Sequence, residues 1–255
     1  MLAEIHNMAL ALYRSQYLNR YSGMRLSKFW LLVMPTLPII LYNFLDKLGI
    51  FTTPPNEAPR AITLSLGVTI YYIFSETIAN TSGALDSNKN YIHRTGIKPE
   101  ACYLSAIYET LTNFAIRYVA CAAIILLFDY QITIQYLLFG LIGIVFALAS
   151  AGVGIILSIF VVFYRDTINI IQTLLFYLLF ASGVFGRVGE GSDIYQIISK
   201  IPTYIAVQTL KNYSLGLPLE NWTPFFITVA LGFVVLVLAG YAYKNAKNTV
   251  ISFLK

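Results

Sequence analysis

Three ionisable side chains, Glu76, Glu109 and Arg117, lie inside long apolar stretches of the sequence. A charge in lipid is costly, so such residues normally face a bundle interior or a wet cavity. A proton relay would need several carboxylates in series, whereas two carboxylates and one arginine fit pairs at helix contacts. Glu109 and Arg117 are about 12 Å apart along one predicted helix. We therefore expect each of them to pair with a side chain on another helix.

The residues that intrinsic catalysis would need are missing. A membrane enzyme needs a nucleophile with a base, or a metal cluster. The only histidines, His6 and His93, fall outside the predicted spans, and Cys102 and Cys121 lie about 28 Å apart on one predicted helix. The sequence contains no GxxxxGK string followed by Ser or Thr, so it does not bind ATP in that way. We expect no catalytic residue, no metal and no cofactor on this chain.

Three tyrosines, Tyr71, Tyr118 and Tyr177, also fall well inside apolar stretches. A phenol in that position needs a polar partner or a wet surface. One interpretation is an aromatic channel lining on which sugar rings slide, because ring stacking tolerates changes of register. The other is core packing with a local hydrogen bond, and the sequence leaves both open.

The composition is that of an all-α polytopic membrane protein. The chain has 255 residues, of which 58% are hydrophobic and 11% are charged, whereas soluble domains carry about 25% charged residues. Several uncharged runs reach the roughly 20 residues that cross a bilayer as a helix. These runs are continuous rather than alternating, which excludes a β-barrel. The net charge of +5 comes from basic residues in short loops, so it does not indicate a nucleic-acid partner.

Six transmembrane helices are predicted within a single domain of residues 1–255. We expect the first to bend, because Pro35 and Pro38 each remove a backbone donor. Residues 1–27 have apolar side chains near helical spacing and predict an amphipathic cytoplasmic helix at the membrane interface. Two short apolar pieces between spans 5 and 6 predict re-entrant helices. The six spans cover about 29–45, 61–85, 101–128, 135–163, 167–186 and 222–243.

Span 4 carries small residues at every fourth position. Gly143, Ala147 and Ala151 form one such series, and Ser150, Gly154 and Ser158 form another. This spacing lets helix backbones approach closely. We expect tight helix packing along span 4, within the subunit or between subunits.

The longest polar gap in the middle of the chain is residues 86–99, DSNKNYIHRTGIKP. Short loops rich in Lys and Arg stay in the cytoplasm. Under the six-span topology eleven of the 17 Lys and Arg residues are cytoplasmic, five are external and Arg117 is in the membrane. This asymmetry predicts that both termini are cytoplasmic. We expect a partner outside the membrane to act on this loop.

Three strings resemble the ABC-2 family of exporter permeases. NRYSGMRLSKFWLLVMP, from Asn19 to Pro35, looks like the entry to the first span of that family. NKNYIHRTGIKPEACYLSAIYET, from Asn88 to Thr110, is similar to its cytoplasmic loop and third span. Tyr164-Arg165-Asp166 resembles its turn between spans 4 and 5.

Two dipeptides, Arg25-Leu26 and Lys98-Pro99, look closest to capsule polysaccharide export permeases, with O-antigen permeases a near second. Ser27 departs from the capsule pattern, which usually has glycine after the leucine. The resemblance implies ATP-driven export of a lipid-linked polysaccharide across a bacterial inner membrane. It also implies a homodimer with two copies of a separate ATPase subunit, which would carry the ATP and Mg. Docking of periplasmic or outer-membrane export proteins is left open.

The resemblance further implies that the N-terminal helix and the 86–99 loop dock on the ATPase, and that the short helices before span 6 shape the external exit. The candidate coupling residues are the cytoplasmic basic side chains Arg14, Arg20, Lys89, Arg94, Lys98 and Arg165. One alternative is an ABC-2 exporter of drugs or lipids. Another, from a different class, is a stand-alone six-span channel or proton-coupled carrier that uses Glu76, Glu109 and Arg117.

Overall fold

The computed structural model describes residues 2–20, 22–50, 58–186, 193–217 and 222–253. Every regular element within these ranges is helical. The helices are α1 (Leu2–Tyr13), the π-helical turn η1 (Arg14–Leu18), α2 (Ser27–Lys47), α3 (Arg60–Ser87), α4 (Lys89–Thr95), α5 (Pro99–Leu127), α6 (Ile134–Phe163), α7 (Thr167–Ala181), α8 (Asp193–Ile198), α9 (Pro202–Ser214) and α10 (Thr223–Phe253).

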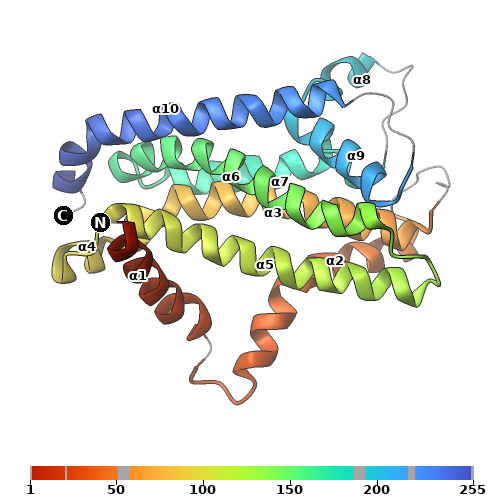
Figure 1. Cartoon of the computed structure of the whole chain (residues 1–255), viewed down its shortest axis with the longest axis horizontal. Helices are drawn as coiled ribbons and strands as arrows, with labels where there is room; N and C mark the ends of the chain where they lie inside the picture. The colour runs from red at the N-terminus through yellow and green to blue at the C-terminus, as the bar shows by residue number, and fades with distance from the viewer. Residues whose placement is uncertain (1, 21, 51–57, 187–192, 218–221, 254–255) are drawn as a thin grey trace.

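Five of these helices, α2, α3, α5, α6 and α10, are long and apolar enough to cross a membrane. They confirm the all-helical membrane class and five of the predicted spans. The first four lie within two residues of their expected ends. Helix α2 is visibly bent (Figure 1), and it contains Pro35 and Pro38 as expected. The two short helices predicted before the last span are present as α8 and α9.

The predicted helix over residues 167–186 is wrong in length. Helix α7 has 15 residues, which is about 22 Å and less than the roughly 30 Å hydrocarbon core. It ends before Gly183, whose φ of 70° is left-handed and typical of a helix end. The turn docks there on α9, because Gln208 Nε2 donates to the Gly183 carbonyl at 2.9 Å.

Three further boundaries differ from the expectation. The N-terminal helix stops at Leu18 instead of reaching residue 27. The 86–99 segment is not an open loop, because it contains α4, which ends at Gly96 with a φ of 65°. Helix α10 continues to Phe253 instead of ending near residue 243. Its last turns are held against the bundle, with Val250 fully buried.

Helix α3 is the centre of the bundle. It packs against α2, α5, α6, α7 and α9, and 78% of the residues in its most apolar stretch are buried. The hydroxyls of Thr69, Thr77 and Thr81 donate to carbonyls one turn earlier in the helix. These bonds satisfy polar groups that have no water available. A helix that is buried nearly all round forms the core on which its neighbours pack.

The small residues of α6 do permit close packing, as expected. A Cβ on Gly143 would meet the ring of Phe114 on α5. A Cβ on Gly152 would lie 2.5 Å from the backbone of Leu236 on α10. The tight packing predicted for this helix is therefore confirmed within the chain.

Both termini and α4 lie at the same end of the bundle, shown at the left of Figure 1. Helix α1 packs against α5 near this end. The apolar face predicted for α1 is used in this contact, because Ala9 and Leu12 are buried. We call this the α4 end of the molecule.

Candidate functional site: a polar furrow on helix α3

Adjoining clefts follow one face of α3 from its middle to the α4 end. Three clefts of about 190, 230 and 340 Å³ share lining residues, and we call them together the α3 furrow. The α3 side chains in it recur three or four positions apart, which places them on one face of the helix. At about 1.5 Å per residue they cover roughly 21 Å of α3. The series is Tyr72, Ser75, Glu76, Ala79, Asn80, Gly83 and Asp86, and Tyr71, Ala84 and Ser87 of α3 border the clefts beside it.

The two walls of the furrow differ. One wall is α7, which contributes Gln172 between apolar side chains. The other is formed by η1, α2 and α5, and it contains Tyr17, Arg20, Glu109 and Asn113. Amide, carboxylate and guanidinium groups therefore face the same space. Such groups suit a ligand rich in hydroxyl groups, which can both donate to carboxylates and accept from amides.

A buried ion pair anchors the inner part of the furrow. Arg117 on α5 is 1% exposed and donates from Nη1 to Glu76 Oε2 at 3.1 Å and from Nη2 to Oε1. Its Nε group donates to the carbonyl of Pro35 in the bend of α2 at 2.7 Å. The guanidinium also lies 4.9 Å from the ring centre of Tyr72. Each nitrogen of the guanidinium group thus has a hydrogen-bond acceptor, as a buried charge requires.

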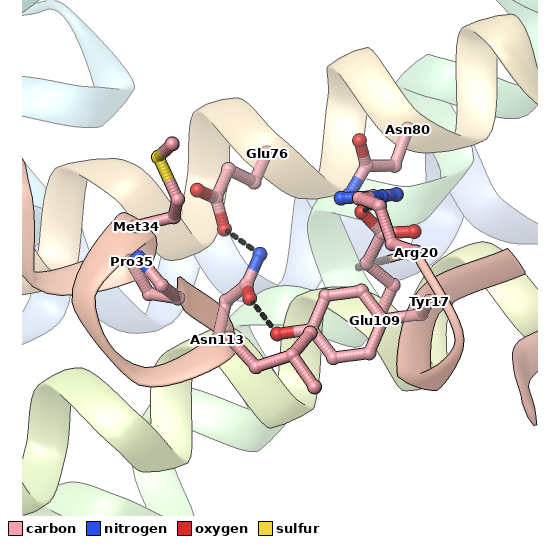
Figure 2. Close-up of a pocket in the computed structure, with 9 residues that line it drawn as sticks. Tyr17, Arg20, Met34, Pro35, Glu76, Asn80, Glu109 and Asn113 are labelled. Carbon is pink, nitrogen blue, oxygen red and sulfur yellow. Dashed lines mark hydrogen bonds and ion pairs between the residues drawn. The ribbon is translucent and has the colours of Figure 1, made fainter. Parts of the chain in front are cut away.

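The Glu76 carboxylate is shared with a second polar chain, drawn in Figure 2. Asn113 Nδ2 donates to Glu76 Oε2 at 3.2 Å. The Tyr17 hydroxyl donates to Asn113 Oδ1. Burial raises the pKa of the Tyr17 phenol, so this group is a neutral donor.

A second ion pair lines the furrow nearer the α4 end. Arg20 Nη2 lies 2.9 Å from Glu109 Oε1, with side chains 44% and 21% exposed. The expectation that Arg117 pairs with another helix and not with Glu109 is confirmed, whereas the partner of Glu109 lies in the turn after η1. An exposed pair of this kind contributes about 0–1 kcal/mol. The Arg20 pair is therefore a weak contact beside the buried Arg117 pair.

The remaining candidate coupling residues gather at the α4 end. Lys98 Nζ lies 2.7 Å from Glu4 Oε2 and joins the start of α5 to α1. Arg165 lies 3.6 Å from Asp86. Arg14 and Arg94 are exposed, and Lys89 is half-buried. The structure thus places these residues at one end of the bundle, and Arg20 alone reaches the furrow.

The charge on Glu4 depends on its partner. The hydrogen bond from Lys98 lowers the pKa of the Glu4 carboxyl below its ordinary value of 4.5. A lowered pKa means that the contact is complete at neutral pH and is lost only as the pH falls through that lowered value. The contact between α1 and the start of α5 is therefore intact throughout the physiological range.

The three candidate channel tyrosines occupy separate environments. Tyr71 is buried and donates to the Leu175 carbonyl on α7. Tyr118 stacks on Tyr136 and donates to its carbonyl at 3.1 Å. Tyr177 on α7 is 65% exposed. Among the placed residues no ring contact joins any two of the three, and Tyr71 alone lines the furrow.

Sequence reasoning missed Tyr17, Asn80 and Asn113. A signal was available, because Asn80 and Asn113 are amides inside predicted spans, where a polar side chain needs a partner. The expectations for the membrane interior covered charged side chains and tyrosines but not amides. Tyr17 carried no signal, because its role depends on how η1 meets α5.

Comparison with known proteins adds no relative. No family model matches the sequence, and no curated protein shows significant similarity to it.

Proposed function

We propose that the chain is the permease subunit of an ATP-driven exporter that moves a lipid-linked polysaccharide of capsule or O-antigen type across a bacterial inner membrane. The observation that carries the proposal is the α3 furrow, which gives a path with polar side chains from the middle of α3 to the α4 end. A second copy facing the furrow would close it into a conduit, since two-fold dimers are the commonest assembly. The ATPase motor is a separate subunit in this proposal.

The proposal includes a sixth crossing made by α7 and the turn after it. Arg165 contacts Asp86 at the α4 end of α3, and the space beside Gly67 is filled by Val184. Nineteen residues of α3 separate these two contacts, which is about 28 Å. A segment of that length reaches across nearly the whole hydrocarbon core. Six crossings put both termini on one side, and the basic residues there favour the cytoplasm.

The α4 end is the proposed docking surface for the ATPase. Helix α4 lies at the end of the bundle that holds both termini (Figure 1). Its Arg94 is exposed, and no ion pair of Arg94 is among those found within the placed residues. A cationic side chain in that position is suited to a carboxylate on a cytoplasmic partner.

Charge reversal at the α4 end tests the coupling. We expect Arg94→Glu to reduce polymer export about tenfold or more while the permease still folds, because a like-charge contact costs over about 1.4 kcal/mol. The measurement is ATPase activity and surface polymer for the reconstituted pair. Lys98→Glu is a less specific variant, because Lys98 also holds Glu4. Unchanged ATPase activity and export in Arg94→Glu would remove α4 from the mechanism.

The path itself is tested by removing its amides. We expect the double variant Asn80→Leu, Gln172→Leu to lose export roughly thirtyfold, because two hydrogen bonds of about 1 kcal/mol each are removed. The control is Tyr177→Ala, which alters an exposed side chain outside the furrow. Full export in the double variant, with loss in alanine variants of Tyr71, Tyr118 and Tyr177, would instead favour the aromatic path.

One observation favours a proton-coupled carrier as the second candidate. The Glu76 side chain is 21% exposed and lines two of the clefts, so a carboxylate is open to the furrow. Transport in vesicles with ATP present and the proton gradient collapsed distinguishes the two. Export continues for an ATP-driven permease and stops for a carrier.

A further inference from the structure

Arg117 connects more elements than its ion pair requires. It lies on α5, bonds Glu76 on α3 with two nitrogens, and bonds the Pro35 carbonyl in α2 with the third. All three nitrogens of one rigid, planar group are used. The bend of α2 and the carboxylate of the furrow are thus held at one relative position.

The same network reaches the N-terminal segment. Glu76 accepts from Asn113, and Asn113 accepts from Tyr17 in η1. The Tyr17 ring stacks on Tyr13 of α1, with ring centres 5.4 Å apart. One ring stack and a series of hydrogen bonds therefore connect α1 and η1, through Glu76 of the furrow, to the bend of α2.

The other polar contacts of the N-terminal segment are less buried than that of Tyr17. The hydrogen bonds of Tyr13 with Thr112 and of Gln16 with Asn88 are partly buried. The pairs of Glu4 with Lys98 and of Arg20 with Glu109 are partly exposed, and such pairs contribute little to stability. The Tyr17 hydroxyl is the buried end of the connection, since Tyr17 is 3% exposed. Docking of α1 should therefore respond to changes in the Arg117 network.

We propose that Arg117 is a positioning residue that couples the docking of α1 to the bend of α2. The role of this coupling in transport rests on the proposed function, in which α1 faces the motor and α2 borders the furrow. Coupling between two sites is reciprocal in free energy. A change at Arg117 must loosen α1, and a change at Tyr17 must loosen the bend of α2.

The first experiment measures undocking of α1 in the purified chain alone. A cysteine is introduced at Ala9, which is fully buried on α1, in a Cys102→Ala background. The remaining Cys121 is buried between α3 and α5 and reports whether the bundle is intact. We expect Arg117→Lys to raise the labelling rate of the cysteine at position 9 about fivefold or more, because lysine lacks the planar fork that places two nitrogens on Glu76 and a third on the Pro35 carbonyl.

The matched control is Arg60→Lys. Arg60 pairs with Asp46 at 2.5 Å and also joins α3 to α2, at the end away from Tyr17. It should leave the labelling rate at position 9 unchanged. Equal rates in Arg117→Lys and the parent, with Cys121 still protected, would overturn the coupling. The measurement uses no ATPase and no polymer, so its result is separate from the fate of the proposed function.

The second experiment changes Tyr17 and measures the bend of α2. It replaces the first experiment if Arg117→Lys exposes Cys121, which would mean that the bundle is no longer intact. Tyr17→Phe removes one hydroxyl and keeps the ring contact with Tyr13. Spin labels at the exposed positions Phe29 and Ile40 flank the bend of α2. We expect Tyr17→Phe to broaden the distance distribution between the labels by about half or more. A distribution identical to that of the parent would contradict the proposal.

Discussion

Replacing Glu76 with methionine is expected to lower the free energy of unfolding by about 3 kcal/mol. The substitution leaves the Arg117 guanidinium, which is 1% exposed, without its carboxylate. An ordinary interhelical hydrogen bond in a membrane protein contributes only about 0.6 kcal/mol. The unpaired charge therefore dominates the loss. The measurement is an SDS titration of the protein in micelles, followed by circular dichroism.

The double variant Glu76→Met, Arg117→Met separates the unpaired charge from lost packing. We expect it to recover most of the stability lost in Glu76→Met, because replacing a buried pair by apolar side chains is often nearly neutral. Asn113 and the Pro35 carbonyl each lose one partner in the double variant, so recovery should be incomplete. A double variant less stable than Glu76→Met would show that the charge balance is not what holds this contact.

Replacing Gly152 with valine is expected to lower the free energy of unfolding by about 3 kcal/mol, at the upper end of what overpacking costs. A Cβ at this position would lie 2.5 Å from both the Cα and the nitrogen of Leu236. The opposing atoms are backbone, so no side chain can rotate away. Helices α6 and α10 must then separate and lose contacts along their length. The same SDS titration measures the effect.

Gly240→Val is the matched control. Gly240 lies in α10, the helix that faces Gly152, but a Cβ at position 240 would have no neighbour within 4 Å. We expect its free energy of unfolding to stay within about 0.5 kcal/mol of the parent. Equal losses at Gly152 and Gly240 would mean that glycine flexibility, and not close packing of α6 on α10, determines the result.

The spans were predictable because they depend on local properties. A run of about 20 apolar residues must form a helix in lipid, since no water satisfies its backbone. Four helices accordingly lie within two residues of their expected ends. The need of Glu109 and Arg117 for partners on other helices followed from the same cost of burying charge.

The helix ends that were wrong depend on contacts far along the chain. Helix α7 stops where Gly183 turns onto α9. Helix α10 continues because Lys247 pairs with Glu100 at 2.5 Å and Val250 is buried. Neither contact is visible in the local hydrophobic pattern, because each partner is supplied by another helix.

The amino-acid sequence by itself determined that this is a helical membrane protein with charged groups that must be paired inside it. Only the tertiary structure decided that Arg117 pairs with Glu76, 41 residues away, and that Glu76 lies on a polar furrow beside Asn80 and Asn113. The physical reason is that hydrophobic length selects a helix, whereas its rotation about its own axis is set by close packing with its neighbours.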